Sequence, residues 1–144
     1  MTKTKHRIPD AVSTGYTIQN LKKIDDSAPK FGLAPNVEAH FATRELECEK
    51  TGVSYQRLAP NARGPFGHKH EEQEEIYVIL SGSGNVKLGG DEHEVKPFDA
   101  VRVSADTIRA FEAGPEGLEL LAFGAPRVSE PDVEMIQGWW GGES

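Results

Sequence analysis

Two histidines and a glutamate near the middle of the chain stand at positions that suit a metal ion. His68 and His70 are separated by one residue, and Glu75 follows shortly after them. On a β-strand, residues i and i+2 point to the same face, so both imidazoles would project in one direction. If a strand beginning at Glu75 lies beside the first, its carboxylate can join them. This set suits a divalent metal and leaves coordination positions open for water or substrate.

The same residues also have an interpretation without chemistry. Chance readily places two of the five histidines at i and i+2, and a cluster of glutamates such as Glu71, Glu72 and Glu74 usually forms a solvated turn. The residues alone therefore leave a metal site and a solvated turn both open.

The segments around these residues predict β-strands. The run Ile76–Leu80 is rich in β-branched and aromatic residues. Ser81–Gly84 is expected to end that strand, and Gly89–Asp91 predicts a hairpin turn. Further strands are expected at residues 16–21, 52–58, 101–103, 108–112 and 118–123, with a turn at 113–117, and residues 37–50 are ambiguous between helix and strand. Short strands separated by regular turns are typical of a sandwich or barrel.

The run from His68 to Gly82 resembles the first motif of the cupin superfamily. That motif reads His-x-His, three or four residues, Glu, six residues and Gly, and here the two gaps are four and six residues long. A weaker second motif follows. Phe98–Val101 stands where cupins often have Gly-Asp and a short apolar strand, and Arg109–Phe111 stands where they often have His-x-Phe.

The resemblance covers roughly residues 52–124 and implies the architecture of a small single-domain cupin. The expected fold is all-β, an antiparallel double-stranded β-helix (the jelly-roll or cupin barrel) with irregular N- and C-terminal extensions. We expect a flexible arm at 1–15, the barrel at 16–125 and a tail at 126–144. In that tail, Trp139 and Trp140 should pack on the barrel or on a partner subunit.

The chain departs from the family at the fourth metal ligand, whose place falls at Arg109. Arginine has no lone pair to offer and stays protonated, so the resemblance carries over at most His68, His70 and Glu75. Three roles for Arg109 remain open. It pairs with Glu75 or Glu74 and replaces the metal, it holds an anionic substrate group near a three-ligand metal, or it lies outside the pocket.

Other residues are weaker candidates. Tyr77 shares the face of Glu75 and is a candidate for substrate binding, beside the alternative of a core tyrosine bonded to the backbone. His93 could substitute as a ligand, although it lies in a hairpin of charged residues, and His6 and His40 are expected on the surface. Cys48 is the only cysteine, so no internal disulfide is possible.

Composition limits the partners. The net charge of −7 makes nucleic acid and anionic membranes poor partners, because phosphate binding needs a basic surface. No apolar run approaches the roughly 20 residues of a membrane helix. We expect a soluble cytoplasmic protein, and the family implies a homodimer.

These observations support two main hypotheses. The first is a metal-dependent enzyme of dioxygenase or isomerase type that acts on a small anionic organic molecule, with Fe, Mn, Ni or Zn as the metal. The alternative is a non-catalytic cupin that binds a small-molecule ligand, without metal if Arg109 replaces the ion. A barrel that serves only as an interaction scaffold is a third hypothesis. The sequence does not decide whether the protein is an enzyme.

Overall fold

The computed structural model describes residues 15–128 and 132–141, so the predicted N-terminal arm lies outside it apart from Gly15. The elements in chain order are the 3₁₀ turns η1 (Leu21–Lys23) and η2 (Ala28–Phe31), followed by the strands β1 (Val37–Phe41), β2 (Gly52–Leu58), β3 (Gly67–His70), β4 (Glu74–Leu88), β5 (Asp91–Val95), β6 (Ala100–Val103), β7 (Arg109–Ala125) and β8 (Val133–Ile136). Within the described residues, no helix is long and apolar enough to cross a membrane.

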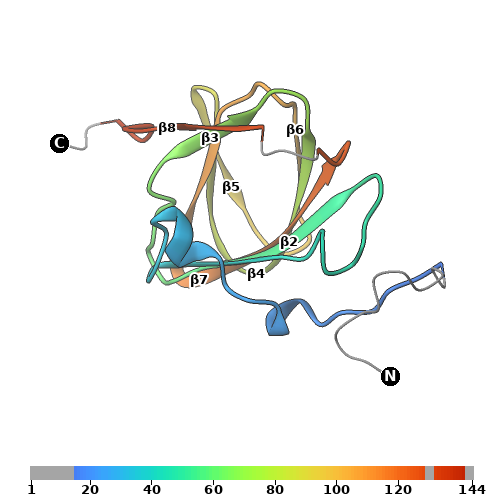
Figure 1. The fold of residues 1–144 in the computed structure, drawn as a ribbon. Coiled ribbons are helices and arrows are strands. Elements are labelled where there is room, and N and C mark those ends of the chain that lie inside the picture. Colours follow the sequence, from blue (N-terminus) through green and yellow to red (C-terminus); the bar gives the residue numbers. More distant parts are fainter. Residues whose placement is uncertain (1–14, 129–131, 142–144) are drawn as a thin grey trace.

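The strands curl into an antiparallel barrel (Figure 1). One path of hydrogen-bonded neighbours runs β1-β2-β7-β3-β8, and β4 pairs with β5, β6 and β7. The pairing of the long strands β4 and β7 therefore joins β5 and β6, which pair with β4, to the strands of that path. The predicted all-β double-stranded β-helix is confirmed.

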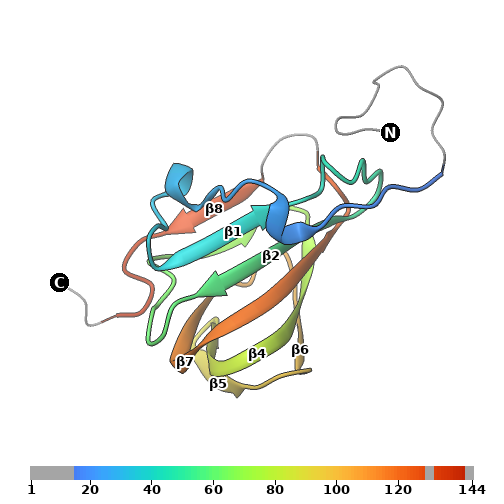
Figure 2. The same ribbon diagram turned by 90° about the horizontal axis from the view of Figure 1, so that it is seen from below.

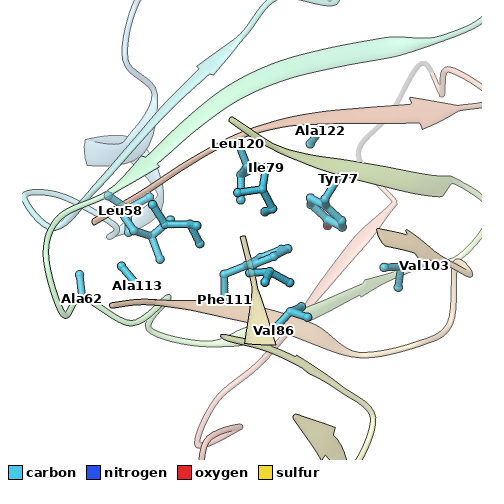
Figure 3. Packing of buried hydrophobic residues seen from close by; sticks show 13 residues of the cluster. Leu58, Ala62, Tyr77, Ile79, Val86, Val103, Phe111, Ala113, Leu120 and Ala122 are labelled. Atoms are coloured by element: carbon cyan, nitrogen blue, oxygen red, sulfur yellow. The ribbon is translucent and has the colours of Figure 1, made fainter. Parts of the chain in front are cut away.

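The core lies inside this curl because the inward residues of β4 and β7 alternate with outward ones. Tyr77 of β4 lies opposite Ala122 of β7, and Ile79 lies opposite Leu120; the side chains of Ile79 and Leu120 are fully buried (Figure 3). Phe111 packs edge-on against the Tyr77 ring, with 5.0 Å between ring centroids. The core thus comes up to Tyr77 and holds that side chain in place at one end of the barrel.

The predicted break at Ser81–Gly84 is wrong, because β4 continues through it to Leu88. The same holds for the predicted turn at 113–117, since β7 runs unbroken from Arg109 to Ala125. The pairing register shifts twice along this stretch, as β-bulges do when they bend a strand. A Cβ atom on Gly84 would lie only 2.1 Å from the carbonyl oxygen of Glu112. The glycine there permits close approach of two strands and does not end one.

The N-terminal part of the described chain also differs from expectation. Residues 16–20 form no strand, so that prediction is wrong, and η1 follows them with the Asn20 side chain accepting a hydrogen bond from the Lys22 N–H. The ambiguous segment resolves into β1, followed by turns at 43–47. Figure 2 shows the chain around η1 lying alongside β1 and β2.

His40 was predicted on the surface and is buried in β1. Its Nδ1 lies 2.6 Å from the Ile24 carbonyl oxygen, and its Nε2 lies 3.2 Å from a Glu38 carboxylate oxygen. Burial lowers the pKa of His40, but the hydrogen bonds to Ile24 and Glu38 outweigh it and raise the pKa above its ordinary value. His40 therefore fastens the segment after η1 onto the sheet, a structural role remote from the motif residues.

The tail returns to the barrel as an added strand. β8 pairs antiparallel with β3, and Trp140 donates from Nε1 to the Gly64 carbonyl at 2.8 Å (Figure 1). The Arg63 guanidinium lies 4.6 Å from the Trp140 ring, and the Lys87 ammonium lies 4.6 Å from the Trp139 ring. These contacts hold residues 132–141 against the barrel, while the division of the chain into three parts stays a prediction.

Candidate metal centre

The three motif residues meet at one end of the barrel. His68 and His70 come from β3 and Glu75 from the start of β4, and their ligand atoms all lie within 4.8 Å of one another. The Glu75 oxygen Oε1 lies 3.6 Å from His68 Nε2 and 3.4 Å from His70 Nε2. His68 keeps 29% of its side chain exposed, so solvent reaches the cluster.

The three residues meet by a different route from the one expected. β3 and β4 are not hydrogen-bonded neighbours, since β3 pairs with β7 and β8 whereas Glu75 pairs with Val103 of β6 and Gly124 of β7. Glu75 therefore meets the histidines across the barrel end, because all three side chains point inward. The curvature of the barrel thus brings together side chains from two strands that are not paired with each other.

Arg109 lies inside this cluster and is almost fully buried, with 1% of its side chain exposed. Its Nη2 donates to Glu75 Oε1 at 2.7 Å and its Nε donates to the Tyr77 hydroxyl at 3.1 Å. Nη1 donates to three backbone carbonyls, those of Ser104, Ala105 and Thr107, at 3.3, 3.3 and 2.7 Å. All three guanidinium nitrogens are thus engaged by protein groups. The alternative that placed Arg109 outside the site is wrong, and the predicted pairing with Glu75 is the observed contact.

Tyr77 connects the carboxylate to the guanidinium. Its hydroxyl donates to Glu75 and accepts from Arg109, so the expectation of a tyrosine bonded to the backbone is wrong. Glu74 points outward as alternation predicts, and its carboxylate lies 3.1 Å from Arg102. Substrate binding by Tyr77 and Arg109 stays a prediction.

The charges at the site favour the metal-binding forms of Glu75 and His68. Burial alone would raise the pKa of Glu75, but the nearby His68 and His70 imidazoles, the Tyr77 hydroxyl and the Arg109 charge hold it far below its usual range. Burial lowers the pKa of His68, which keeps that imidazole neutral. An ionised carboxylate and a neutral imidazole are the forms that bind a metal. Burial lowers the pKa of His70, but its contacts with Glu75 and Asp132 outweigh burial and raise the pKa above its ordinary value.

His70 is oriented by a residue that the sequence did not reveal. Its Nδ1 lies 2.7 Å from Oδ1 of Asp132, just before β8. Burial raises the pKa of Asp132, but the hydrogen bonds from His70 and two backbone N–H groups outweigh it and hold the pKa at about 2. Asp132 lies far along the chain in a tail without a recognisable motif, so only the β3–β8 pairing reveals it.

The other ring nitrogen of His70 tests whether the site fits a metal. Within the described structure, His70 Nε2 is buried and makes no hydrogen bond, since the Glu75 carboxylate oxygen 3.4 Å away is not placed to accept one. Buried polar atoms without partners are rare and costly, and this one faces His68 and Glu75. A metal ion would satisfy it, so the residues present fit a divalent ion. His93 lies exposed in β5 opposite Val86, outside the cluster.

Comparison with known proteins identifies the domain. Residues 54–124 match the family model described as "Cupin domain". The chain carries a cupin domain. Over 71 residues, this cupin is 35% identical to an uncharacterised protein of Methanocaldococcus jannaschii. That alignment covers 49% of the present chain and 57% of the relative, so it spans little more than half of that protein.

Solved structures show the same fold. A cupin protein from Bacteroides fragilis superposes with a TM-score of 0.65 at 24% identity, covering 82% of this chain and 90% of that one. A predicted oxalate decarboxylase from Thermotoga maritima superposes with a TM-score of 0.56 at 26% identity, covering 63% of this chain and 81% of that one. The architecture is therefore that of a small cupin barrel.

Proposed function

We propose that this cupin binds a divalent metal through His68, His70 and Glu75 and acts on a small anionic organic molecule at that centre. The Nε2 of His70 carries the proposal, because within the described residues it is a buried ring nitrogen without a hydrogen bond that faces the other two ligands. Three protein ligands would leave coordination positions open to a substrate. Bound there, Fe, Mn, Ni or Zn would supply Lewis-acid chemistry or, for iron, oxygen chemistry of the dioxygenase type.

The charge balance supports an anionic substrate. Glu75 and Arg109 neutralise each other through their 2.7 Å ion pair. Two neutral imidazoles add no charge, so a divalent ion would leave the centre positive even with Asp132 beside His70. A partly desolvated positive centre attracts an anion strongly. The structural neighbour whose name specifies oxalate decarboxylase supports a small organic acid, and an isomerase-type reaction is equally compatible with the centre.

The protein's own residues would prepare the site. Arg109 and Tyr77 fix one carboxylate oxygen of Glu75, and Asp132 fixes the His70 ring. The guanidinium is itself held by three carbonyls, so the carboxylate has little freedom to rotate. Such preorganisation holds ligands in place before the ion arrives.

A second function is favoured by one observation. The Arg109 guanidinium already supplies a positive charge to Glu75, where a metal would supply another. A cupin that binds a small molecule without metal and without catalysis is therefore the competing proposal. The homodimer and the cytoplasmic location stay predictions.

The test screens ligands with and without metal. The tag-free protein would be loaded in turn with Fe(II), Mn(II), Ni(II) and Zn(II), then incubated with small mono- and dicarboxylic acids and sugar phosphates. NMR would follow substrate loss, and an oxygen electrode would follow oxygen uptake. We expect metal-dependent turnover that His70→Ala abolishes and His93→Ala, a change at an exposed histidine, retains. Equal ligand binding without metal and in His70→Ala, with no turnover, would favour the metal-free function.

A further inference from the structure

We propose that Asp132, which lies beyond the barrel's last long strand, is a positioning residue that sets the tautomer of His70. The inference rests on the proposed metal site, because it concerns how one ligand of that site is prepared. It assigns part of the site to the tail.

The contacts of Asp132 define a built acceptor position. Oδ1 faces His70 Nδ1 at 2.7 Å, whereas Oδ2 accepts from the backbone N–H groups of Glu72 and Gln73 at 2.9 and 3.1 Å. The side chain is only 11% exposed. One carboxylate therefore holds both the ring and the turn that leads from His70 to Glu75.

This geometry selects one form of the neutral ring. An ionised carboxylate only accepts hydrogen bonds, so the His70 nitrogen beside it must carry the proton. A neutral imidazole has a single N–H, so Nε2 then carries the lone pair. Nε2 is the nitrogen that faces Glu75 at 3.4 Å. Asp132 thus prepares the nitrogen that a metal would bind.

The tail is held where this contact requires it. β8 pairs with β3 in a register that sets Val133 opposite His70, which brings Asp132 next to the turn. The Glu71 N–H also donates to the Asp132 carbonyl at 3.2 Å. The tail fits closely at its other end as well, since a Cβ on Gly67 would lie 2.6 Å from the Trp139 ring. The position of Asp132 thus follows from strand pairing.

The substitution Asp132→Asn nearly keeps the shape of the side chain but replaces the hydrogen-bond acceptor that faces His70 with a donor. The amide oxygen would stay with the two backbone N–H groups, because they need an acceptor. The amide NH₂ would then face His70 and donate to Nδ1. Donation to Nδ1 favours the tautomer protonated at Nε2. In that tautomer Nε2 has no lone pair to offer a metal.

The matched control is Glu134→Gln. Glu134 lies on β8, loses the same charge on substitution and is mostly exposed, with its carboxylate 3.9 Å from Lys69. Any effect of net charge on metal attraction would appear in both variants. An effect through His70 would appear in Asp132→Asn alone.

The test reads the tautomer directly in metal-free protein by long-range ¹H–¹⁵N NMR of ¹⁵N-labelled histidine, in alkaline buffer where the rings are neutral. We expect His70 protonated at Nδ1 in the wild type and Glu134→Gln, and at Nε2 in Asp132→Asn. Titration with Mn²⁺, followed by loss of the free-ion EPR signal, should show about ten- to hundredfold weaker binding in Asp132→Asn. A wild-type ring protonated at Nε2, or a tautomer unchanged by Asp132→Asn, would overturn the inference. The expected tautomers with no Mn²⁺ binding in any variant would uphold the positioning role and count against the proposed metal function.

Discussion

Exchanging Arg109 for methionine is expected to lower the free energy of unfolding of the metal-free protein by about 3–5 kcal/mol, since it breaks a buried ion pair on one side. Methionine fills much of the volume but leaves the Glu75 carboxylate without its 2.7 Å partner. It also removes the donor from the backbone carbonyls of Ser104, Ala105 and Thr107. Urea unfolding at neutral pH, with chelator present, measures the loss.

The matched control is Arg102→Met. Arg102 makes a similar contact with Glu74 at 3.1 Å, but that pair is exposed, so its loss should change stability by at most about 1 kcal/mol. The double variant Arg109→Met with Glu75→Leu should recover part of the loss, because it removes both charges. Equal losses of stability in Arg109→Met and Arg102→Met would contradict a stabilising role for the buried Arg109–Glu75 ion pair.

The same variant separates the two proposed functions. If Arg109 and a metal coexist, Arg109→Met relieves the repulsion between two positive groups, so Mn²⁺ should bind it more tightly and restore much of its stability. If Arg109 replaces the ion altogether, the wild type should bind no Mn²⁺ and only the variant should do so.

Exchanging Gly84 for alanine is expected to lower the free energy of unfolding by about 3 kcal/mol or more, because the added methyl group meets backbone atoms. Its Cβ would lie 2.1 Å from the Glu112 carbonyl oxygen and 3.2 Å from the Ala113 Cα. Neither atom can swing away as a flexible side chain would, so β4 and β7 must separate. Because the two strands are paired along most of their length, the strain would fall on the centre of the fold.

Gly90→Ala is the control for this prediction. Gly90 lies in the turn after β4, and a Cβ there would meet nothing within 4 Å. Thermal and urea unfolding of the two variants should therefore differ sharply, with Gly90→Ala close to the wild type. Similar stability of both variants would contradict the close β4–β7 approach.

The close approach of β4 and β7 at Gly84 explains why the sequence-based prediction ended the strand at Ser81–Gly84. Ser81–Gly84 has the composition of a turn, but in the barrel it lets two long strands bend together through register shifts. Local composition reports that a glycine is needed and does not report whether a turn or a close neighbour needs it. The strand at Gly52–Leu58 was predicted correctly because its pattern is local.

The site could be predicted from the motif only as far as the motif extends. The spacing of His68, His70 and Glu75 indicated a cluster, and the structure brings the three together. The contact of Asp132 with His70 depends on strand pairing between segments 62 residues apart, for which the sequence holds no local signal. The burial of His40 likewise depends on the segment at Ile24, whose backbone carbonyl lies 2.6 Å from His40 Nδ1, and no periodicity of either segment predicts that contact.

The most direct test of the central claim is the metal content of tag-free protein purified without chelator, measured by plasma mass spectrometry. The account predicts a near-stoichiometric divalent metal in the wild type and in His93→Ala, and its loss in His68→Ala and His70→Ala. Absence of metal from all four proteins, even after incubation with Fe(II), Mn(II), Ni(II) and Zn(II), would contradict the metal site and leave Arg109 as the permanent partner of Glu75.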